Sequence, residues 1–343
     1  TPDFFAEGQG WQWVRWAQMA EAGTLEEEWR RQVTADEALA ERRAAGSIRS
    51  AQEILDGSIP SYASEADYDV AAARTQPWIR AAGSVAGKLG IPVNSRIAVH
   101  PDGLYPTVRV PPDHIVKFYG PWRHGLGTME AELAALQLIS RNAEIKAPRL
   151  VGHGTLDADW SYLVMSVVRG RPLAEVRDEL ETSDMTRVAR WLGAFVRQLR
   201  ALSLDGVETE RPTRYFVDTI TRRHADLGQI LSDGAVLPHR LLEQVDAWKP
   251  SLEQLGPLDT PVLVHADLHA GHVFGDDING RFMPTGVIDL NRARLGHRLY
   301  ELGPVWCWLF RGDGSLLSHF LDEAAYPERS GQDFPKIALA WCL

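Results

Sequence analysis

Cysteine is scarce in this sequence: only Cys307 and Cys342 occur among its 343 residues. Two cysteines exclude a small domain stapled by disulfides and a zinc module built on cysteine ligands. Long apolar runs are also missing, since the longest candidate, residues 305–310, falls far short of the ~18–20 residues that a membrane-spanning helix needs. No basic stretch followed by an apolar one opens the chain, so the sequence predicts no signal peptide. We expect a cytoplasmic protein with no membrane partner.

Positive charge is in short supply as well. Lys plus Arg number 36 against 46 for Asp plus Glu, which gives a formal net charge of −10. A nucleic-acid-binding protein needs clustered basic side chains, so we expect no nucleic-acid partner. Apolar residues make up 45% and charged residues 24% of the chain, which excludes a disordered protein or a fibre. The length predicts two domains, or two lobes around a cleft, and leaves the oligomeric state open.

Composition divides the chain into three segments. Residues 1–85 are rather polar and predict a helical extension, with helix-capping patterns at residues 24–27 and 50–53. Residues 86–169 predict a small β-rich lobe with one helix, and residues 170–343 predict a larger helical lobe that holds one β-hairpin. The sequence therefore predicts an α+β fold of two lobes, with a ligand site in the cleft between them.

The small lobe is predicted to be a sheet with one helix. Paired strands are expected at residues 107–110 and 114–119, joined by a Pro-Pro-Asp turn. Apolar residues at helical spacing predict a helix over residues 128–141. Two more strands are expected at residues 147–151 and 161–168.

In the larger lobe, an apolar face over residues 188–202 predicts a long amphipathic helix. Residues 261–264 predict a short buried strand. Asn279-Gly280, between short apolar stretches at 273–274 and 286–288, predicts a β-hairpin.

The densest group of ionisable side chains follows the buried strand directly. It comprises His265, Asp267, His269 and His272. Asp289 ends the return strand of the hairpin and can therefore come back beside His272. This arrangement offers one carboxylate placed as a base, and a second carboxylate with an imidazole as a metal-binding pair.

Phosphoryl transfer requires parts of this kind. The protein must position an acceptor hydroxyl, accept its proton and neutralise phosphate charge with a divalent cation and a basic side chain. Lys117 lies near the end of an apolar strand in the other lobe, where it can hold phosphates. A carboxylate on the following helix would orient this lysine; Glu132 is the better candidate and Glu130 the alternative.

These residues resemble the aminoglycoside phosphotransferase and choline kinase family, which has a protein-kinase-like fold. The family pattern is H-x-D-x-x-x-x-N, a hairpin, then I-D, and this chain has His265-x-Asp267, His272 and then Ile288-Asp289. The resemblance spans roughly residues 85–310. It also includes Val116-Lys117, residues 132–136, residues 162–165 and Gly170-x-Pro172-Leu173.

The resemblance implies a role for each matching residue. Asp267 would accept or orient the proton of the substrate hydroxyl, and Asp289 would bind Mg²⁺ that bridges the phosphates of ATP or GTP. Lys117, paired with Glu132, would hold those phosphates. The nucleotide base would be read by the hinge residues Met165, Ser166, Val167 and Val168. The implied activity is a small-molecule kinase that phosphorylates a hydroxyl of an antibiotic or related metabolite, in resistance or self-protection.

Two features depart from the family pattern. His272 replaces the metal-binding Asn, and imidazole suits softer metals than Mg²⁺. Sequences resembling macrolide kinases carry His at this place, so the change is compatible with activity and with use of Mn²⁺. The nucleotide loop, residues 100–107, has one glycine where relatives often have two.

Two other functions stay open from the residues alone. The cluster of His265, Asp267, His269 and His272 could bind zinc and activate water as a metal-dependent hydrolase. Alternatively, the chain could be a kinase-like nucleotide-binding module without catalytic activity.

Overall fold

The computed structural model describes residues 72, 75–93, 96–100, 104–120, 125–156, 160–233, 239–244 and 249–342. Most of the predicted helical extension, including both capping patterns, lies outside the described residues. The same is true of residues 101–103 in the predicted nucleotide loop. The two predicted boundaries between the three segments stay predictions.

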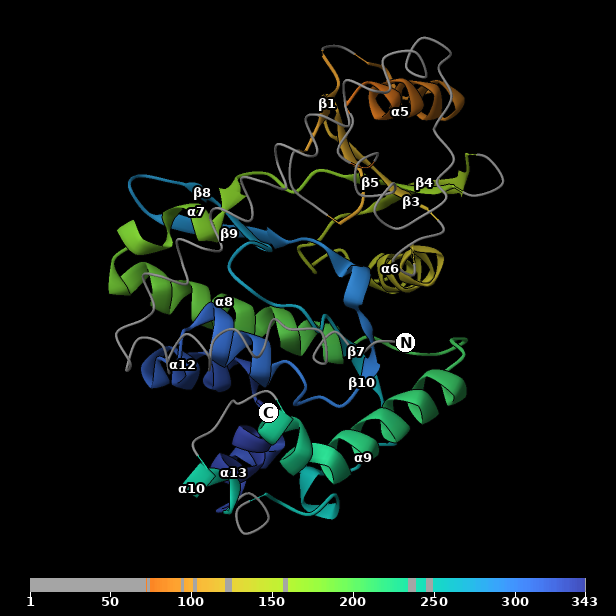
Figure 1. Ribbon diagram of the computed structural model, residues 1–343. Helices are drawn as coiled ribbons and strands as arrows, with labels where there is room; N and C mark the ends of the chain where they lie inside the picture. Colours follow the sequence, from red (N-terminus) through yellow and green to blue (C-terminus); the bar gives the residue numbers. More distant parts are fainter. Residues whose placement is uncertain are drawn as a thin grey trace.

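The small lobe is built on an antiparallel sheet. Within the described residues, five strands follow the order β1-β2-β3-β5-β4. They are β1 (Ala98–Val99), β2 (Thr107–Val110), β3 (His114–Tyr119), β4 (Leu150–Thr155) and β5 (Ser161–Ser166). Helix α5 (Gln76–Lys88), which crosses the first predicted boundary, packs on this sheet, and α6 (Gly125–Ile139) lies between the sheet and the larger lobe (Figure 1).

The alternation of side chains along β3 and β5 separates two cores. Val116 and Phe118 of β3 lie in the cluster that also contains Trp78 of α5. The neighbouring Lys117 and Tyr119 point to the opposite face, because successive residues of a strand alternate between faces. Tyr119 belongs to the cluster that continues through α6 into the larger lobe. The period of the strand therefore turns Lys117 toward the larger lobe.

The sequence predicted β2, β3 and α6 well, but β4 begins three residues later than expected. The reason is Arg149, whose guanidinium donates to the carbonyls of Ile139, Asn142, Ala143 and Ile145. These bonds tie the residues before β4 to the end of α6, so they form a connecting loop instead of a strand.

The larger lobe is mainly helical. Its principal helices are α7 (Leu173–Val176), α8 (Thr182–Arg200), α9 (Glu210–Asp233), α10 (His239–Leu242), α12 (Gly314–Ala324) and α13 (Phe334–Ala340). A π-helical segment covers Pro304–Leu309, and 3₁₀ turns cover Arg177–Glu179, Glu253–Leu255, Leu290–Arg292 and Pro327–Ser330. Among these described helices, none is both long and apolar enough to cross a bilayer.

Two small sheets complete the larger lobe. One pairs β7 (Val262–Val264) with β10 (Arg294–Gly296). The other joins β6 (Arg171–Pro172), β8 (Val273–Asp277) and β9 (Phe282–Val287). The predicted hairpin is confirmed: Ile278 and Arg281 exchange backbone hydrogen bonds across Asn279 and Gly280. Both turn residues have positive φ, 57° and 74°, as a tight two-residue hairpin turn requires.

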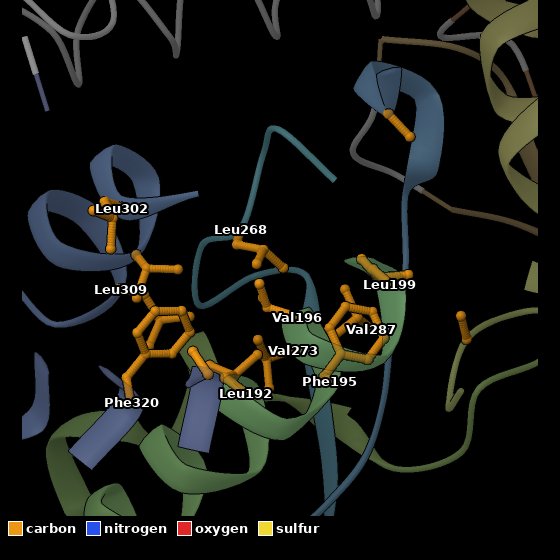
Figure 2. Close-up of a cluster of buried hydrophobic side chains, with 14 of the residues drawn as sticks. Leu192, Phe195, Val196, Leu199, Leu268, Val273, Val287, Leu302, Leu309 and Phe320 are labelled. Atoms are coloured by element: carbon orange, nitrogen blue, oxygen red, sulfur yellow. The ribbon is translucent and has the colours of Figure 1, made fainter. Parts of the chain in front are cut away.

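The core of the larger lobe lies directly beneath the loop after β7. Leu268, within that loop, is fully buried. It packs with apolar residues of α8 and of the π-helical segment, among them Val196 and Leu309 (Figure 2). The hairpin adds Val273 and Val287 to the same cluster. One apolar side chain therefore anchors the loop that holds the predicted catalytic residues.

Candidate active site

Lys117 and Glu132 form a buried pair in the small lobe. Lys117 Nζ lies 3.0 Å from Glu132 Oε2, with 9% and 2% of the two side chains exposed. The hydroxyl of Tyr119 donates to the same Glu132 oxygen. Burial and the adjacent Glu132 raise the pKa of Tyr119 well above its usual value, so this hydroxyl remains a donor at neutral pH. Glu130, the alternative partner, is exposed.

Lys117 also bridges to the larger lobe. Its Nζ lies 2.6 Å from Asp289 Oδ1, a contact between residues 172 positions apart. Burial alone would lower the pKa of Lys117, but Asp289 and Glu132 outweigh it and raise the pKa. Burial likewise favours protonation of Asp289, yet Lys117 holds the pKa of that carboxyl well below its ordinary range. Both groups are therefore ionised at neutral pH.

The loop from His265 to His272 is held by a buried carboxylate. Glu301 Oε1 accepts hydrogen bonds from the backbone N–H groups of His265 and Ala266. His265 is fully buried, and its Nε2 lies 3.0 Å from the Ile288 carbonyl oxygen. Burial lowers the pKa of His265 to about 4, so the ring is neutral and braces the loop against the strand end before Asp289.

His272 lies between the two aspartates. Its Nδ1 is 2.8 Å from the Asp267 carbonyl oxygen, and its Nε2 is 3.4 Å from Asp289 Oδ2. Because a carbonyl only accepts, Nδ1 carries the proton and Nε2 offers a lone pair toward Asp289. Burial lowers the pKa of His272 to about 4, which keeps the ring neutral. A neutral imidazole and a carboxylate thus face the same small volume.

Asp267 is 8% exposed, and its carboxylate has a cationic neighbour. Arg292 Nε lies 3.5 Å from Asp267 Oδ2, and His272 Nδ1 lies 3.8 Å from the same oxygen. Burial raises the pKa of Asp267, and the nearby histidines and Arg292 oppose that shift. The result is a carboxylate of increased basicity in a partly closed position.

The predicted hinge residues lie at the end of β5, on the strand next to Lys117. Met165 is buried, and Ser166 Oγ accepts a bond from the Arg149 N–H. The Val167 N–H donates to the Asp113 carbonyl and extends the ladder between β3 and β5. Lys117 pairs with Leu163 in that ladder, so the hinge begins two residues further along β5.

The roles of three residues of this site were not predicted from the sequence. Tyr119 supports Glu132, and Glu301 holds the loop backbone. Arg292 lies beside Asp267. Helix α6 packs against the Leu290–Arg292 turn, so the helix of Glu132 and the segment after Asp289 support each other. Only the arrangement in space links these residues to the site.

A small antiparallel sheet and a helical lobe, joined by a lysine–aspartate pair, define a kinase-like phosphotransferase fold. Residues 102–336 match the phosphotransferase enzyme family APH. Since the match covers well over half of the chain, the protein belongs to this family. Membership confirms the resemblance inferred from the sequence and agrees with a phosphotransferase activity. The hypothesis of a metal-dependent hydrolase does not account for membership in this family.

Solved structures of aminoglycoside phosphotransferases share the fold. The GDP and kanamycin complex of APH(2")-IIia is 15% identical, with a TM-score of 0.57 over 76% of this chain and 87% of that one. The GDP complex of wild-type aminoglycoside 2'-phosphotransferase-IIIa is 16% identical, with a TM-score of 0.56 over 76% and 86%. The gentamicin complex of APH(2")-IIa is 16% identical, with a TM-score of 0.51 over 75% and 83%.

A plant protein with a different described function also matches part of this chain. Lysine-specific demethylase JMJ21 of Arabidopsis thaliana is 23% identical over an alignment of 204 positions that covers 49% of this chain. The chain matches only 22% of that protein's length. Such a match concerns one part of the plant protein.

Proposed function

We propose that this protein is a small-molecule kinase that transfers the γ-phosphoryl group of ATP or GTP to a hydroxyl of an antibiotic or related metabolite. The observation that supports it most is an unbroken set of contacts from the small lobe to Asp267. Lys117 lies 2.6 Å from Asp289, which lies 3.4 Å from His272, which lies 3.8 Å from the Asp267 carboxylate. A basic side chain for phosphates and a carboxylate base thus meet in one site.

Asp267 is the proposed catalytic residue. A base assists best when it lies within hydrogen-bond reach of the hydroxyl and has a pKa near the operating pH. Burial moves the pKa of Asp267 upward, in that direction. Arg292, beside it, keeps a positive charge next to the reacting groups and opposes protonation of Asp267. Lys117 would bind the nucleotide phosphates while Glu132 and Tyr119 fix its position.

Asp289 and His272 are the residues that would hold a divalent cation. The carboxylate of Asp289 is ionised and 27% exposed, and carboxylate oxygen is the kind of ligand that a hard cation prefers. The neutral His272 imidazole is tolerated better by Mn²⁺ than by Mg²⁺, since nitrogen ligands favour softer ions. The cation would neutralise charge on the transferring phosphoryl group.

The nucleotide and acceptor are proposed from the hinge and from the neighbouring structures. Met165, Ser166, Val167 and Val168 would line the base pocket through backbone groups, which suits either ATP or GTP. Structural neighbours are complexes with GDP, ADP, kanamycin and gentamicin, which supports a nucleotide and a hydroxyl-rich antibiotic as ligands. Resistance or self-protection in the cytoplasm is the role we propose.

A nucleotide screen followed by transfer assays tests the proposal. ATP or GTP with Mg²⁺ should raise the melting temperature by mass action, and phosphate should pass to at least one hydroxyl-bearing antibiotic. Asp267→Ala should reduce turnover on the order of 10²–10⁴-fold, the usual contribution of a general base, and keep the nucleotide-induced thermal shift.

Asp259→Ala, at an exposed loop position, is the matched control and should retain full turnover. Normal turnover in Asp267→Ala would remove Asp267 from the mechanism. Nucleotide binding without transfer to any acceptor would favour the non-catalytic module.

A further inference from the structure

His269 is an ionisable residue of the loop that the proposed reaction does not use. Its ring centroid lies 3.7 Å from that of His272, with the planes tilted by 39°. His269 Nδ1 accepts a hydrogen bond from the Gly271 N–H at 3.1 Å. This local bond holds the imidazole against the loop, on the side where His272 and Asp267 also lie.

Asp267, His269 and His272 together form a set of metal-ligating side chains. One ligand atom from each lies within 4.8 Å of the other two. Zinc binds nitrogen and carboxylate oxygen at ~2.0–2.2 Å in a tetrahedron, so neighbouring ligand atoms around it are ~3.4 Å apart. His272 would bind through Nε2, the nitrogen that carries the lone pair, because Nδ1 donates its proton to the Asp267 carbonyl. Side-chain movements on the order of 1 Å would close the set around an ion.

The donor types select a particular class of ion. Two imidazoles and one carboxylate suit Zn²⁺ and similar transition metals, whereas Mg²⁺ prefers oxygen ligands alone. His265 and Arg292 do not add to this set: His265 lies outside the group of ligand atoms that come within 4.8 Å of one another, and a guanidinium has no lone pair to offer. Asp289 is near enough to His272 to add a fourth ligand, since their facing atoms are 3.4 Å apart.

We propose that Asp267, His269 and His272 form a binding site for Zn²⁺, and that the bound ion inhibits the enzyme. An ion on the Asp267 carboxylate removes the lone pairs that would accept the acceptor's proton. The inhibitory part rests on the proposed function, while binding of the ion does not. Through this site, free transition-metal ions would lower the activity of the enzyme. An asparagine at position 272 would weaken that response.

Zinc binding to the full chain, measured by competition with a chromophoric chelator without nucleotide or acceptor, tests the site. The chain should bind one Zn²⁺ whose affinity falls at least tenfold in His269→Asn. His269→Cys should restore it, because a thiolate is a good zinc ligand. His239→Asn, at an exposed histidine of α10, is the matched control and should leave the affinity unchanged. Equal affinity in the wild type and His269→Asn, with both proteins folded by thermal melting, would overturn the site.

Inhibition is measured separately, as the Zn²⁺ concentration that halves phosphoryl transfer at fixed Mg²⁺ and nucleotide. That concentration should rise at least tenfold in His269→Asn and return toward the wild-type value in His269→Cys. Transfer with the same zinc sensitivity in all three proteins would refute the inhibitory site and leave the proposed kinase intact. If zinc binding depended on His269 but the protein phosphorylated no acceptor, the zinc site would stand and the proposed kinase activity would be refuted.

Discussion

The two halves of the site are held in place by different means. Lys117, Glu132 and Tyr119 stand on a regular strand and a regular helix, so the backbone fixes them through repeating hydrogen bonds. Asp267 and Asp289 stand on irregular segments, and a few buried polar contacts fix them instead. The small-lobe half is therefore protected by redundancy, whereas the large-lobe half depends on single residues such as Glu301.

Backbone conformation shows the same contrast. Ala266 and Asp289 both have left-handed φ values, 65° and 64°. A side chain in that region costs roughly 1–2 kcal/mol, and such residues persist only where the surroundings impose the conformation. No described residue of β3 or α6 has a positive φ. Two of the five described non-glycine residues with positive φ thus lie at Asp289 and directly before Asp267, the two carboxylates beside His272.

The largest expected effect comes from breaking the small-lobe half. Lys117→Met leaves Glu132 buried without its cation, and loss of one partner of a buried pair costs about 3–5 kcal/mol. The remaining Tyr119 bond favours the lower end of that range. Chemical denaturation should report this loss of stability, and the nucleotide-induced thermal shift should disappear.

Two further variants sharpen this result. Lys146→Met changes an exposed lysine and should affect neither quantity. The double variant Lys117→Met with Glu132→Gln removes the more deeply buried of the two unpaired charges, while the partly exposed Asp289 stays charged, and it should recover part of the lost stability. Full additivity of the two substitutions would mean that the pair is not energetically coupled.

A smaller effect is expected from the large-lobe half, and it depends on pH. Burial raises the pKa of Glu301 to about 7, although the N–H groups of Ala266 and His265 oppose the shift. A carboxyl with a raised folded-state pKa stabilises the fold fully below its unfolded pKa, near ~4.3, and that stabilisation is lost as pH rises through 7. The wild type should therefore lose on the order of 2–3 kcal/mol between pH 5 and pH 8 relative to Glu301→Gln.

The quantity to compare is the change of the free energy of unfolding with pH, because Glu301→Gln also changes the absolute stability. Its oxygen can still accept the two N–H bonds, but the buried Oε2 position, which has no hydrogen-bond partner, would then hold an amide donor. Glu323→Gln, at a half-buried position of α12, serves as the control. Parallel stability curves for the wild type and Glu301→Gln would show that Glu301 does not titrate in this range.

The smallest expected effect concerns the strained loop backbone. Ala266→Gly relieves a left-handed alanine and should raise the free energy of unfolding by up to ~1 kcal/mol. Asn279→Gly, at a left-handed position in the exposed hairpin turn, is the comparison and should gain less, because asparagine tolerates this conformation better. A loss of stability in Ala266→Gly would mean that the alanine methyl contributes packing that outweighs its strain.

The sequence predicted most of what depends on periodicity. Alternation and apolar spacing identified β2, β3 and α6, and Asn-Gly identified the hairpin turn. The same patterns paired Lys117 with the correct glutamate. They gave no indication of Glu301, because a lone glutamate in a helical region is ordinarily a surface residue. Its role follows from the packing of residues 265 and 301 against each other, over a separation of 36 positions.

The roles of Arg292 and Tyr119 could not be predicted from the sequence for a related reason. An arginine in a loop has many surfaces available, and only the 3₁₀ turn at Leu290–Arg292 brings it to Asp267. The tyrosine fits any apolar strand pattern, so its hydroxyl bond to Glu132 is visible only in three dimensions. Local patterns therefore predicted the framework of the site, while contacts between distant segments determined its electrostatics.

The short contact between Lys117 and Asp289 has a consequence for ligand entry. Each of these charges already has an opposite charge beside it. In the proposed kinase, an arriving polyphosphate would therefore exchange partners with them instead of filling an empty positive pocket. Its measured affinity would be the difference between new and old ion pairs. A cation that accompanied the phosphates would make the exchange symmetrical, since the aspartate would receive a positive neighbour when the lysine received a negative one.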